Sequence, residues 1–457
     1  MAKSAQAKSA PGFLERQFQL TANGTDVRTE VVAGITTFLT MAYIIFVNPG
    51  IITSAVPDMP FQAVMIGTIV AAAFATILMA FIANYPVALA PGMGLNAYFA
   101  FTVIGAMGVP WQTALGAVFI SGVVFILLTL TRVREAIIDA VPASLKGAIG
   151  AGIGFFIAFI GLKNGGIVVS DPATFVALGD FSEPGTLLAV IGVIVTGALM
   201  AMKVKGSILF GIIATAVIGW IMGLAPMPKG IVQVPTFSDW APVFGKLDIM
   251  GALRLGFFEI VFAFLFVDLF DTVGTLIGVA KQGNFLDKNG RLPRAKDALL
   301  ADSIGTVGGA IFGTPTVTSY IESAAGVAVG GKTGLTALVV AGCFLLSLFF
   351  TPVIEAIATA GTSVASSPVT AAALILVGSL MVRAVLDVKW DDPTEAIPAF
   401  IAMIAMPLTY SIATGISLAF VLFPLFKLVS GKGKEVHWIL WVLAVVFVFR
   451  FIFLSAA

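Results

Sequence analysis

Four carboxylates lie in stretches of sequence that are otherwise apolar enough to cross a membrane. Asp268 and Asp271 stand in the middle of the run from Phe257 to Ala280, Asp302 opens the next run, and Glu322 follows a break rich in Thr and Pro. A carboxylate at the centre of a spanning helix costs roughly 2.5–3.5 kcal/mol on insertion scales, so such residues face protein, water or a ligand. We therefore expect the chemistry of this chain in the stretch that holds them.

Carboxylates in such a setting can bind a flat nitrogen heterocycle and can carry a proton. One carboxylate accepts two N–H donors side by side, and these charge-assisted hydrogen bonds are stronger than neutral ones. A buried carboxyl group can also exchange protons near neutral pH. The single histidine, His437, lies near the far end of the chain. We therefore expect carboxylates, and not an imidazole, to be the groups that carry a proton.

Structural roles compete with these interpretations. An aspartate inside a membrane can pair with a basic residue or cap a broken helix. Asp271, one turn after Asp268, can act as a supporting partner of that residue. Asp302 can cap the N-terminus of its helix after the basic loop that precedes it. Tyr98 and Phe99 can stack on a ligand or simply pack in the core.

Composition places the chain among helical proteins that cross the membrane many times. Hydrophobic residues make up 59% of its 457 residues and charged residues 11%, whereas soluble domains have roughly 25% charged residues. The net charge of +1 does not indicate a nucleic-acid partner. A single cysteine, Cys343, excludes a disulfide framework and a cysteine metal cluster. We expect an all-α protein of the cell membrane, surrounded by lipid.

Apolar runs long enough to cross a hydrocarbon core of about 30 Å recur along the chain. In the first half they are Val31–Ile52, Gln62–Ala83, Val87–Met107, Gln112–Thr131, Val141–Leu162, Thr186–Met202 and Ser207–Leu224. In the second half they are Ala252–Ala280, Ala298–Phe312, Val317–Gly330, Leu335–Ala358, Pro368–Val385, Ala396–Val429 and His437–Leu454. The run that contains Pro407 is either one broken helix or a hairpin, so fourteen or fifteen spans are predicted.

The distribution of Lys and Arg predicts the orientation. Basic residues precede the first span or follow even-numbered spans, among them Lys3, Lys8, Arg16, Arg28, Arg132, Arg134, Lys203, Lys205, Lys281, Lys288, Arg291, Arg294, Lys296, Arg383 and Lys389. Because cytoplasmic loops carry the excess of positive charge, the N-terminus is predicted to be cytoplasmic. Lys427, Lys432 and Lys434 fit this side only if the Pro407 run is a hairpin.

The two halves of the chain look related. Each half has an interrupted third span, and the interrupting residues, Pro91 and Pro315, lie 224 positions apart. Seven spans is an odd number, so the second repeat would run through the membrane in the inverted direction. We divide the chain into a cytoplasmic tail (1–29), a first repeat (30–225), an extracytoplasmic connection (226–250) and a second repeat (251–457).

Paired interruptions of this kind predict a binding site near the membrane midplane. Proline and β-branched threonine favour extended backbone before each helix restarts. The restarted helices, near Asn96 and Glu322, would point free N–H groups at the centre, where a ligand can bind. Asn96 is therefore a candidate for the wall of a pocket. Thr36, Thr37 and Thr40 are further candidates, although threonines commonly bond back to their own helix.

These motifs resemble those of the nucleobase–cation symporters of the nucleobase–ascorbate type, and within them the azaguanine-type purine permeases. The resemblance rests on Phe266-Val-Asp268-Leu-Phe-Asp271-Thr272, Ala301-Asp302-Ser-Ile-Gly and Thr316-Val-Thr-Ser-Tyr320-Ile-Glu322-Ser. The stretches Gly34–Tyr43 and Met406-Pro-Leu-Thr-Tyr410 are similar as well, and the match runs from Arg28 to Ser430.

The resemblance implies fourteen helices in two inverted seven-helix repeats, divided into a core domain and a gate domain. Substrate would lie between the third and tenth spans and face the eighth. Asp268 takes the position of the base-binding carboxylate, Glu322 that of the tenth-span acidic or amide residue, and Asp302 that of an aspartate linked to coupling. Further positions that the resemblance places beside the base are Tyr320, Ile321 and Phe99. Thr272 and Ser323 depart from the uracil and xanthine branches and favour the purine branch.

Together these features predict a proton-coupled importer of hypoxanthine, guanine or adenine that works by alternating access. Asp268, Glu322, Asp302 and Asp271 would carry the proton, with no metal and no other cofactor, although sodium is an open alternative. We also consider a homodimer. An anion exchanger would require a central Lys or Arg, and the tenth span has no such residue before Lys332. An intramembrane aspartyl protease would want Gly-x-Gly-Asp in place of Leu300-Ala-Asp302.

Overall fold

The computed structural model describes residues 12–131, 140–225, 227–228, 230–254, 257–288, 291–361 and 367–453. Lys3, Lys8, Arg132 and Arg134, which contribute to the predicted orientation, lie outside these residues. The N-terminal tail contains a short helix, α1 (Phe13–Phe18), whose last residue, Phe18, is fully buried. The tail therefore packs against the membrane domain in part.

The first half of the chain is helical apart from a short strand and a hairpin. Its elements are α2 (Val27–Met41), α3 (Ile44–Ala55), α4 (Phe61–Leu78), the π-helix η1 (Met79–Ala83), β1 (Leu89–Pro91), α5 (Met93–Ala97), the π-helix η2 (Tyr98–Ala106), α6 (Trp111–Thr131), α8 (Ala143–Asn164), β2 (Val168–Asp171), β3 (Phe175–Leu178), α9 (Pro184–Ala201) and α10 (Ser207–Ile221).

The second half, in its described residues, is also helical apart from one short strand. Its elements are α11 (Phe237–Trp240), α12 (Ile249–Arg254), α13 (Phe257–Gly283), α14 (Ala295–Phe312), β4 (Val317–Ser319), α15 (Ser323–Ala328), α16 (Gly334–Ser347), η3 (Leu348–Phe350), α17 (Thr351–Ala358), α18 (Pro368–Met381), η4 (Val382–Asp387), α19 (Pro393–Leu408), α20 (Ile412–Val429), η5 (Gly433–Glu435) and α21 (Trp438–Phe453).

The prediction of an all-α membrane protein is confirmed. Within the described residues, nine helices are long and apolar enough to cross a membrane. Shorter apolar helices accompany them at Met93–Ala106, Ser207–Ile221, Pro393–Leu408 and Trp438–Phe449. The count of fourteen or fifteen spans stays a prediction.

The Pro407 run is a hairpin, which decides between the two alternatives left open above. α19 ends at Leu408, α20 begins at Ile412, and the two helices pack against each other. Tyr410, in the turn, has a left-handed φ of 55°. Ser411 then caps α20 by accepting a hydrogen bond from the Thr414 backbone N–H. Pro407 lies in the last turn of α19, where it does not have to bend a longer helix.

The helices form two packing groups, each drawn from both halves of the chain. In the first group α14 packs on α4 and α6, α16 on α2 and α4, and α15 on α2 and α13. In the second, α18 packs on α8 and α9, and α19 on α8 and α20.

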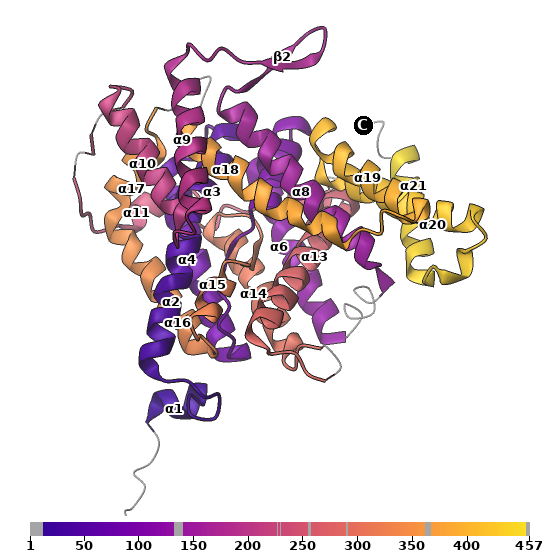
Figure 1. Ribbon diagram of the computed structural model, residues 1–457, viewed down its shortest axis with the longest axis horizontal. Coiled ribbons are helices and arrows are strands. Elements are labelled where there is room, and N and C mark those ends of the chain that lie inside the picture. The colour runs from indigo at the N-terminus through magenta and orange to yellow at the C-terminus, as the bar shows by residue number, and fades with distance from the viewer. Residues whose placement is uncertain are drawn as a thin grey trace, which may run out of the picture.

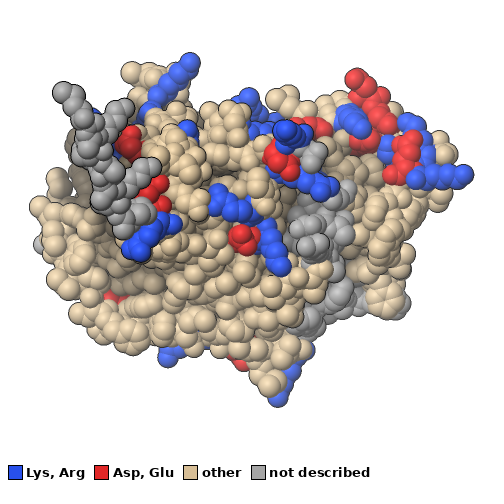
Figure 2. Space-filling view, turned by 90° about the horizontal axis from the view of Figure 1, so that it is seen from below, with Lys and Arg blue, Asp and Glu red and all other residues tan. Residues whose placement is uncertain are grey.

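In Figure 1 the hairpin of β2 and β3 and the helix α1 project from opposite ends of the molecule. Figure 2 views the α1 end, over which Lys and Arg side chains are spread. The cytoplasmic placement of this end stays a prediction.

Candidate functional site

The two interruptions meet as a pair of antiparallel strands. β1 and β4 are paired through Leu89 with Ser319, Ala90 with Thr318, and Pro91 with Val317, and all six of these residues are buried. Two flanking bonds extend the pairing: the Gly92 N–H donates to the Thr316 carbonyl, and the Tyr320 N–H donates to the Ala88 carbonyl, each at 3.0 Å. The predicted extended breaks are therefore confirmed. Each break satisfies its backbone with the other, as non-helical backbone at membrane depth requires.

Side chains from both repeats fix the ends of this strand pair. The Tyr320 hydroxyl donates to the Pro91 carbonyl at 2.5 Å, and the Ser323 hydroxyl accepts from the Ala88 N–H at 3.0 Å. A Cβ at Gly92 would come within 2.8 Å of Thr318 Cγ2, so this close approach requires glycine. Tyr320, which the sequence placed beside a ligand, thus has its hydroxyl committed to the backbone of the other repeat.

Glu322 follows the strand at the start of α15 and is partly exposed. The Tyr43 hydroxyl, from the break between α2 and α3, donates a hydrogen bond to Glu322 Oε1 at 2.5 Å. Thr40 lies nearby and donates to the Thr37 carbonyl at 2.7 Å and to the Glu322 carbonyl at 3.4 Å. Sequence reasoning missed Tyr43 as a site residue, although it ends one of the motifs quoted above. The available signal was a tyrosine at the point where the first span is interrupted.

Asp271 lies on the same side of the strand pair as Glu322. The Thr318 hydroxyl donates to Asp271 Oδ2 at 3.4 Å. Asp271 is also close enough to Glu322 and to the Tyr43 hydroxyl to interact with them electrostatically. Like Glu322, it is partly exposed. The structure thus brings two carboxylates and a phenol together at the edge of the strand pair.

Asp268 lies on a different side of α13 and faces α14. It is fully buried, and the hydroxyls of Thr272 and Thr306 each lie 3.3 Å from one of its carboxylate oxygens. The Thr272 hydroxyl is also 3.0 Å from Asp302 Oδ1, so it links the two aspartates. The described hydrogen bonds therefore connect Asp268 to Asp302 through Thr272, whereas those of Asp271 lead to β4.

Asp302 does not cap its helix. α14 begins at Ala295, so Asp302 lies about two turns inside it and is fully buried. The alternative that it caps a helix N-terminus is wrong, because the apolar run predicted the start of the helix three residues too late. Asp302 instead accepts a hydrogen bond from Thr272 and so belongs to a buried polar network.

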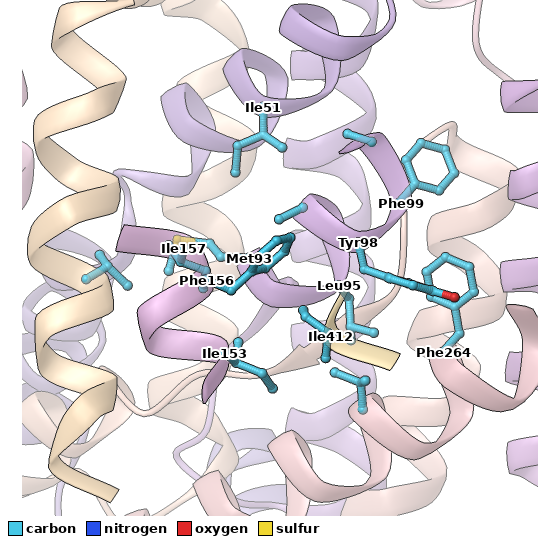
Figure 3. Close-up of a cluster of buried hydrophobic side chains, with 14 of the residues drawn as sticks. Ile51, Met93, Leu95, Tyr98, Phe99, Ile153, Phe156, Ile157, Phe264 and Ile412 are labelled. Carbon is cyan, nitrogen blue, oxygen red and sulfur yellow. The ribbon is translucent and has the colours of Figure 1, made fainter. Parts of the chain in front are cut away.

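Asn96 and the two aromatic residues after it differ in their surroundings. Asn96 is fully buried, and neither atom of its amide has a hydrogen-bond partner among the described residues. The ring of Tyr98 packs edge-on against Phe264 of α13, with centroids 5.1 Å apart, and Figure 3 shows the Tyr98 side chain directed at Phe264. Phe99 is fully buried in the core. Of the three, Asn96 has unused hydrogen-bonding groups.

The described salt bridges lie elsewhere, at the ends of α19 and α20. Lys427 pairs with Glu395 at 3.1 Å and with Asp392 at 3.4 Å, and Lys432 pairs with Asp392 at 3.2 Å. In Figure 2 the mixed red and blue group at the right lies over these helix ends. At the strand pair, by contrast, the hydrogen-bond partners described for Glu322 and Asp271 are hydroxyl groups.

Comparison with known proteins gives a consistent result. A family model described as "Permease family" matches residues 28–418. A permease of Methanocaldococcus jannaschii is 54% identical over 97% of this chain and 99% of its own. The guanine/hypoxanthine permease PbuG of Bacillus subtilis is 47% identical over 96% of this chain and 99% of its own. The adenine permease AdeP of Escherichia coli is 42% identical over 98% of both chains.

Solved structures show the same fold at low sequence identity. The transmembrane domain of the cyanobacterial bicarbonate transporter BicA aligns with a TM-score of 0.59, at 13% identity, over 85% of this chain and 97% of that one. This likeness concerns the fold alone.

Proposed function

This chain belongs to the permease family of nucleobase–ascorbate transporters, and on that premise we propose that it imports purine bases by alternating access. Relatives named guanine/hypoxanthine and adenine permeases match nearly its whole length. It is a multi-pass membrane transporter and not an enzyme. The substrate that we propose is therefore hypoxanthine, guanine or adenine.

The observation that carries this proposal is the pair of partly exposed carboxylates beside the strand pair. Glu322 and Asp271 lie within membrane-spanning segments, where such groups mark substrate or ion pathways. A purine base presents N–H donors along its edge, and a carboxylate can accept two of them side by side. Tyr43 orients Glu322, and Thr318 orients Asp271. We propose that these two carboxylates bind the edge of the base.

The unused amide of Asn96 supports the same proposal. Buried polar groups are nearly always hydrogen-bonded, and an unsatisfied one costs about 1–3 kcal/mol. A purine carries both donors and ring acceptors, which match the two halves of an amide. We propose that Asn96 contacts the base.

We assign proton coupling to the Asp268–Thr272–Asp302 network. Two buried carboxylates that share one hydroxyl are costly when both are charged, so a proton on one of them relieves the pair. Thr306 connects this network to β4, because its hydroxyl lies 3.0 Å from the Val317 carbonyl and 3.3 Å from the Asp268 carboxylate. Protonation of this network can therefore change the hydrogen bonding of β4, the strand that borders the proposed substrate site.

Anion exchange on the same fold is the main competing function. The similarity in fold to a bicarbonate transporter does not favour anion exchange, because at 13% identity this similarity shows the fold alone. Bound anions need positive charge or N–H donors, whereas the side chains that border this site include two carboxylates. The purine proposal therefore fits the site better.

Uptake of radiolabelled hypoxanthine into liposomes that contain the purified protein tests the proposal. An inward proton gradient should drive accumulation, and a proton ionophore should abolish it. Uptake that the ionophore leaves unchanged would overturn proton coupling and retain the purine substrate. Bicarbonate exchange without purine uptake would overturn the proposed function itself.

A further inference from the structure

One face of α13 changes from buried to open at Asp271. Val267 and Phe270, before Asp271, are 1% and 8% exposed. Gly274, Ile277 and Lys281, after it, are exposed. Positions 267, 270, 274, 277 and 281 follow the three- and four-residue spacing of one helix face. The same face is therefore covered on one side of the site and uncovered on the other.

The covered part of this face meets the second packing group. Phe270 lies against Phe266 of its own helix and Phe420 of α20, with ring centroids 5.7 and 6.3 Å away. The open part begins at Gly274, where an added Cβ would meet no described atom within 4 Å. One turn further along, Ile321 lies against Gly278: it is 50% exposed, and its Cδ1 is 2.9 Å from where a Cβ of Gly278 would stand.

We expect this opening to face water and not lipid. Asp271 and Glu322 border it, and both are partly exposed. A partly exposed carboxylate within a spanning segment faces a water-filled cavity, because exposure to lipid is too costly. The opening continues along α13 to Lys281, near the basic loop that holds Lys288 and Arg291, which is predicted to be cytoplasmic.

We infer that Gly274 and Ile321 line an aqueous passage from the carboxylate pair to the cytoplasm, and that the absent side chain of Gly274 sets its width. The inference rests on the proposed function, since it makes this passage the route by which the base leaves. Ile321 lies against Gly278, one turn after Gly274 on the same helix, and on this inference the structure corresponds to the state that is open to the cytoplasm. A larger residue at position 274 fills the space through which a purine must pass.

Thiol accessibility tests the passage without relying on transport. The chain has one native cysteine, so Cys343→Ala gives a cysteine-free background. Gly274→Cys in that background should react with a charged, membrane-impermeant methanethiosulfonate reagent in inside-out vesicles. Gly342→Cys is the matched control, because Gly342 of α16 is also exposed and a Cβ there would contact none of the described atoms within 4 Å. No Asp, Glu, Lys or Arg adjoins it in the sequence, so we expect it to face lipid and to remain unmodified.

Two results would overturn the passage. One is that the two cysteines are modified to the same extent, which includes the case in which neither reacts. The other is that Gly274→Cys is modified from the extracytoplasmic side alone. Hypoxanthine should slow the reaction at position 274. If labelling at 274 is fast but hypoxanthine does not affect it, the passage stands and the proposed substrate is wrong.

Transport by size variants tests the width. Gly274→Ala should reduce hypoxanthine uptake and Gly274→Leu should abolish it, with the amount of protein in the membrane unchanged. Gly342→Leu should transport like the parent protein. Normal uptake by Gly274→Leu would overturn the role of this glycine, whatever the substrate of the transporter.

Discussion

The hydroxyl of Tyr43 donates a hydrogen bond to Glu322 across 279 positions of sequence. Tyr43 comes from the break in the first span of one repeat, and Glu322 from the restart of the third span of the other. The contact therefore joins the two repeats at the carboxylate proposed to bind substrate. It also makes the orientation of that carboxylate depend on a residue that carries no charge near neutral pH.

Tyr43→Phe should weaken substrate binding without unfolding the protein. It removes a hydrogen bond to a carboxylate, which is worth about 1.5–3 kcal/mol, so the KM for hypoxanthine should rise roughly tenfold or more. Tyr85→Phe is a suitable control, because the Tyr85 hydroxyl accepts a bond from Arg294 outside the site. An unchanged KM for Tyr43→Phe would show that Glu322 does not need this partner.

The four site carboxylates should separate into two classes when neutralised. Glu322→Gln and Asp271→Asn should abolish both uptake and the thermal stabilisation by hypoxanthine, since they border the strand pair. Asp268→Asn and Asp302→Asn should also abolish accumulation, but the protein should still be stabilised by the base. Normal accumulation by Asp268→Asn or Glu322→Gln would contradict their assignment, and loss of base binding in Asp268→Asn would return that residue to the substrate site.

Asn96→Leu should lose purine binding while the free protein stays at least as stable. Its amide has no hydrogen-bond partner in the described part of the chain, so the substitution breaks no internal bond and removes an unsatisfied polar group. The melting temperature and its shift with hypoxanthine measure the two effects separately. A large fall in melting temperature of the free protein would instead indicate a structural role.

Asp392 should make stability depend on pH at the end of α19. Hydrogen bonds from the side chain and backbone of Thr394, followed by Lys432 and Lys427, lower the pKa of Asp392 below its usual value of 3.8. A lowered folded-state pKa stabilises the protein above the unfolded-state pKa, and this contribution is lost as the pH falls through the folded-state pKa. The melting temperature of Asp392→Asn should therefore lie below that of the parent at pH 7 and approach it in acid. Asp391→Asn, at the exposed neighbouring position, should show no such convergence.

The membrane class, the two interruptions and the carboxylate-bearing spans could be predicted from the sequence because each has a local cause. Apolar length predicts spans, and Pro91 and Pro315 predict extended backbone. The pairing of β1 with β4 required a structure, since no local pattern specifies a partner more than two hundred residues away. The sequence does not decide the turn at Tyr410, because a proline near the end of one helix and one in the middle of a longer helix give similar patterns.

The different surroundings of Asp268 and Asp271 show a second limit of prediction from the sequence. These residues are three positions apart, so they point about 60° apart around α13, a difference that follows from 3.6 residues per turn. That angle decides whether a carboxylate meets α14 or β4, and it depends on how the helix is rotated in the bundle. Tyr43 could not be identified as a site residue from the sequence, because its partner, Glu322, lies in the other repeat.

The strand pair constrains how the protein is made. Pro91 accepts its bond from Tyr320, which is translated 229 residues later, and each strand supplies the backbone partners of the other. The first interruption therefore enters the bilayer with unpaired amides that only the second half of the nascent chain can satisfy. Biogenesis of this transporter must keep that segment hydrated or chaperoned until the ribosome has delivered α14 and the strand behind it.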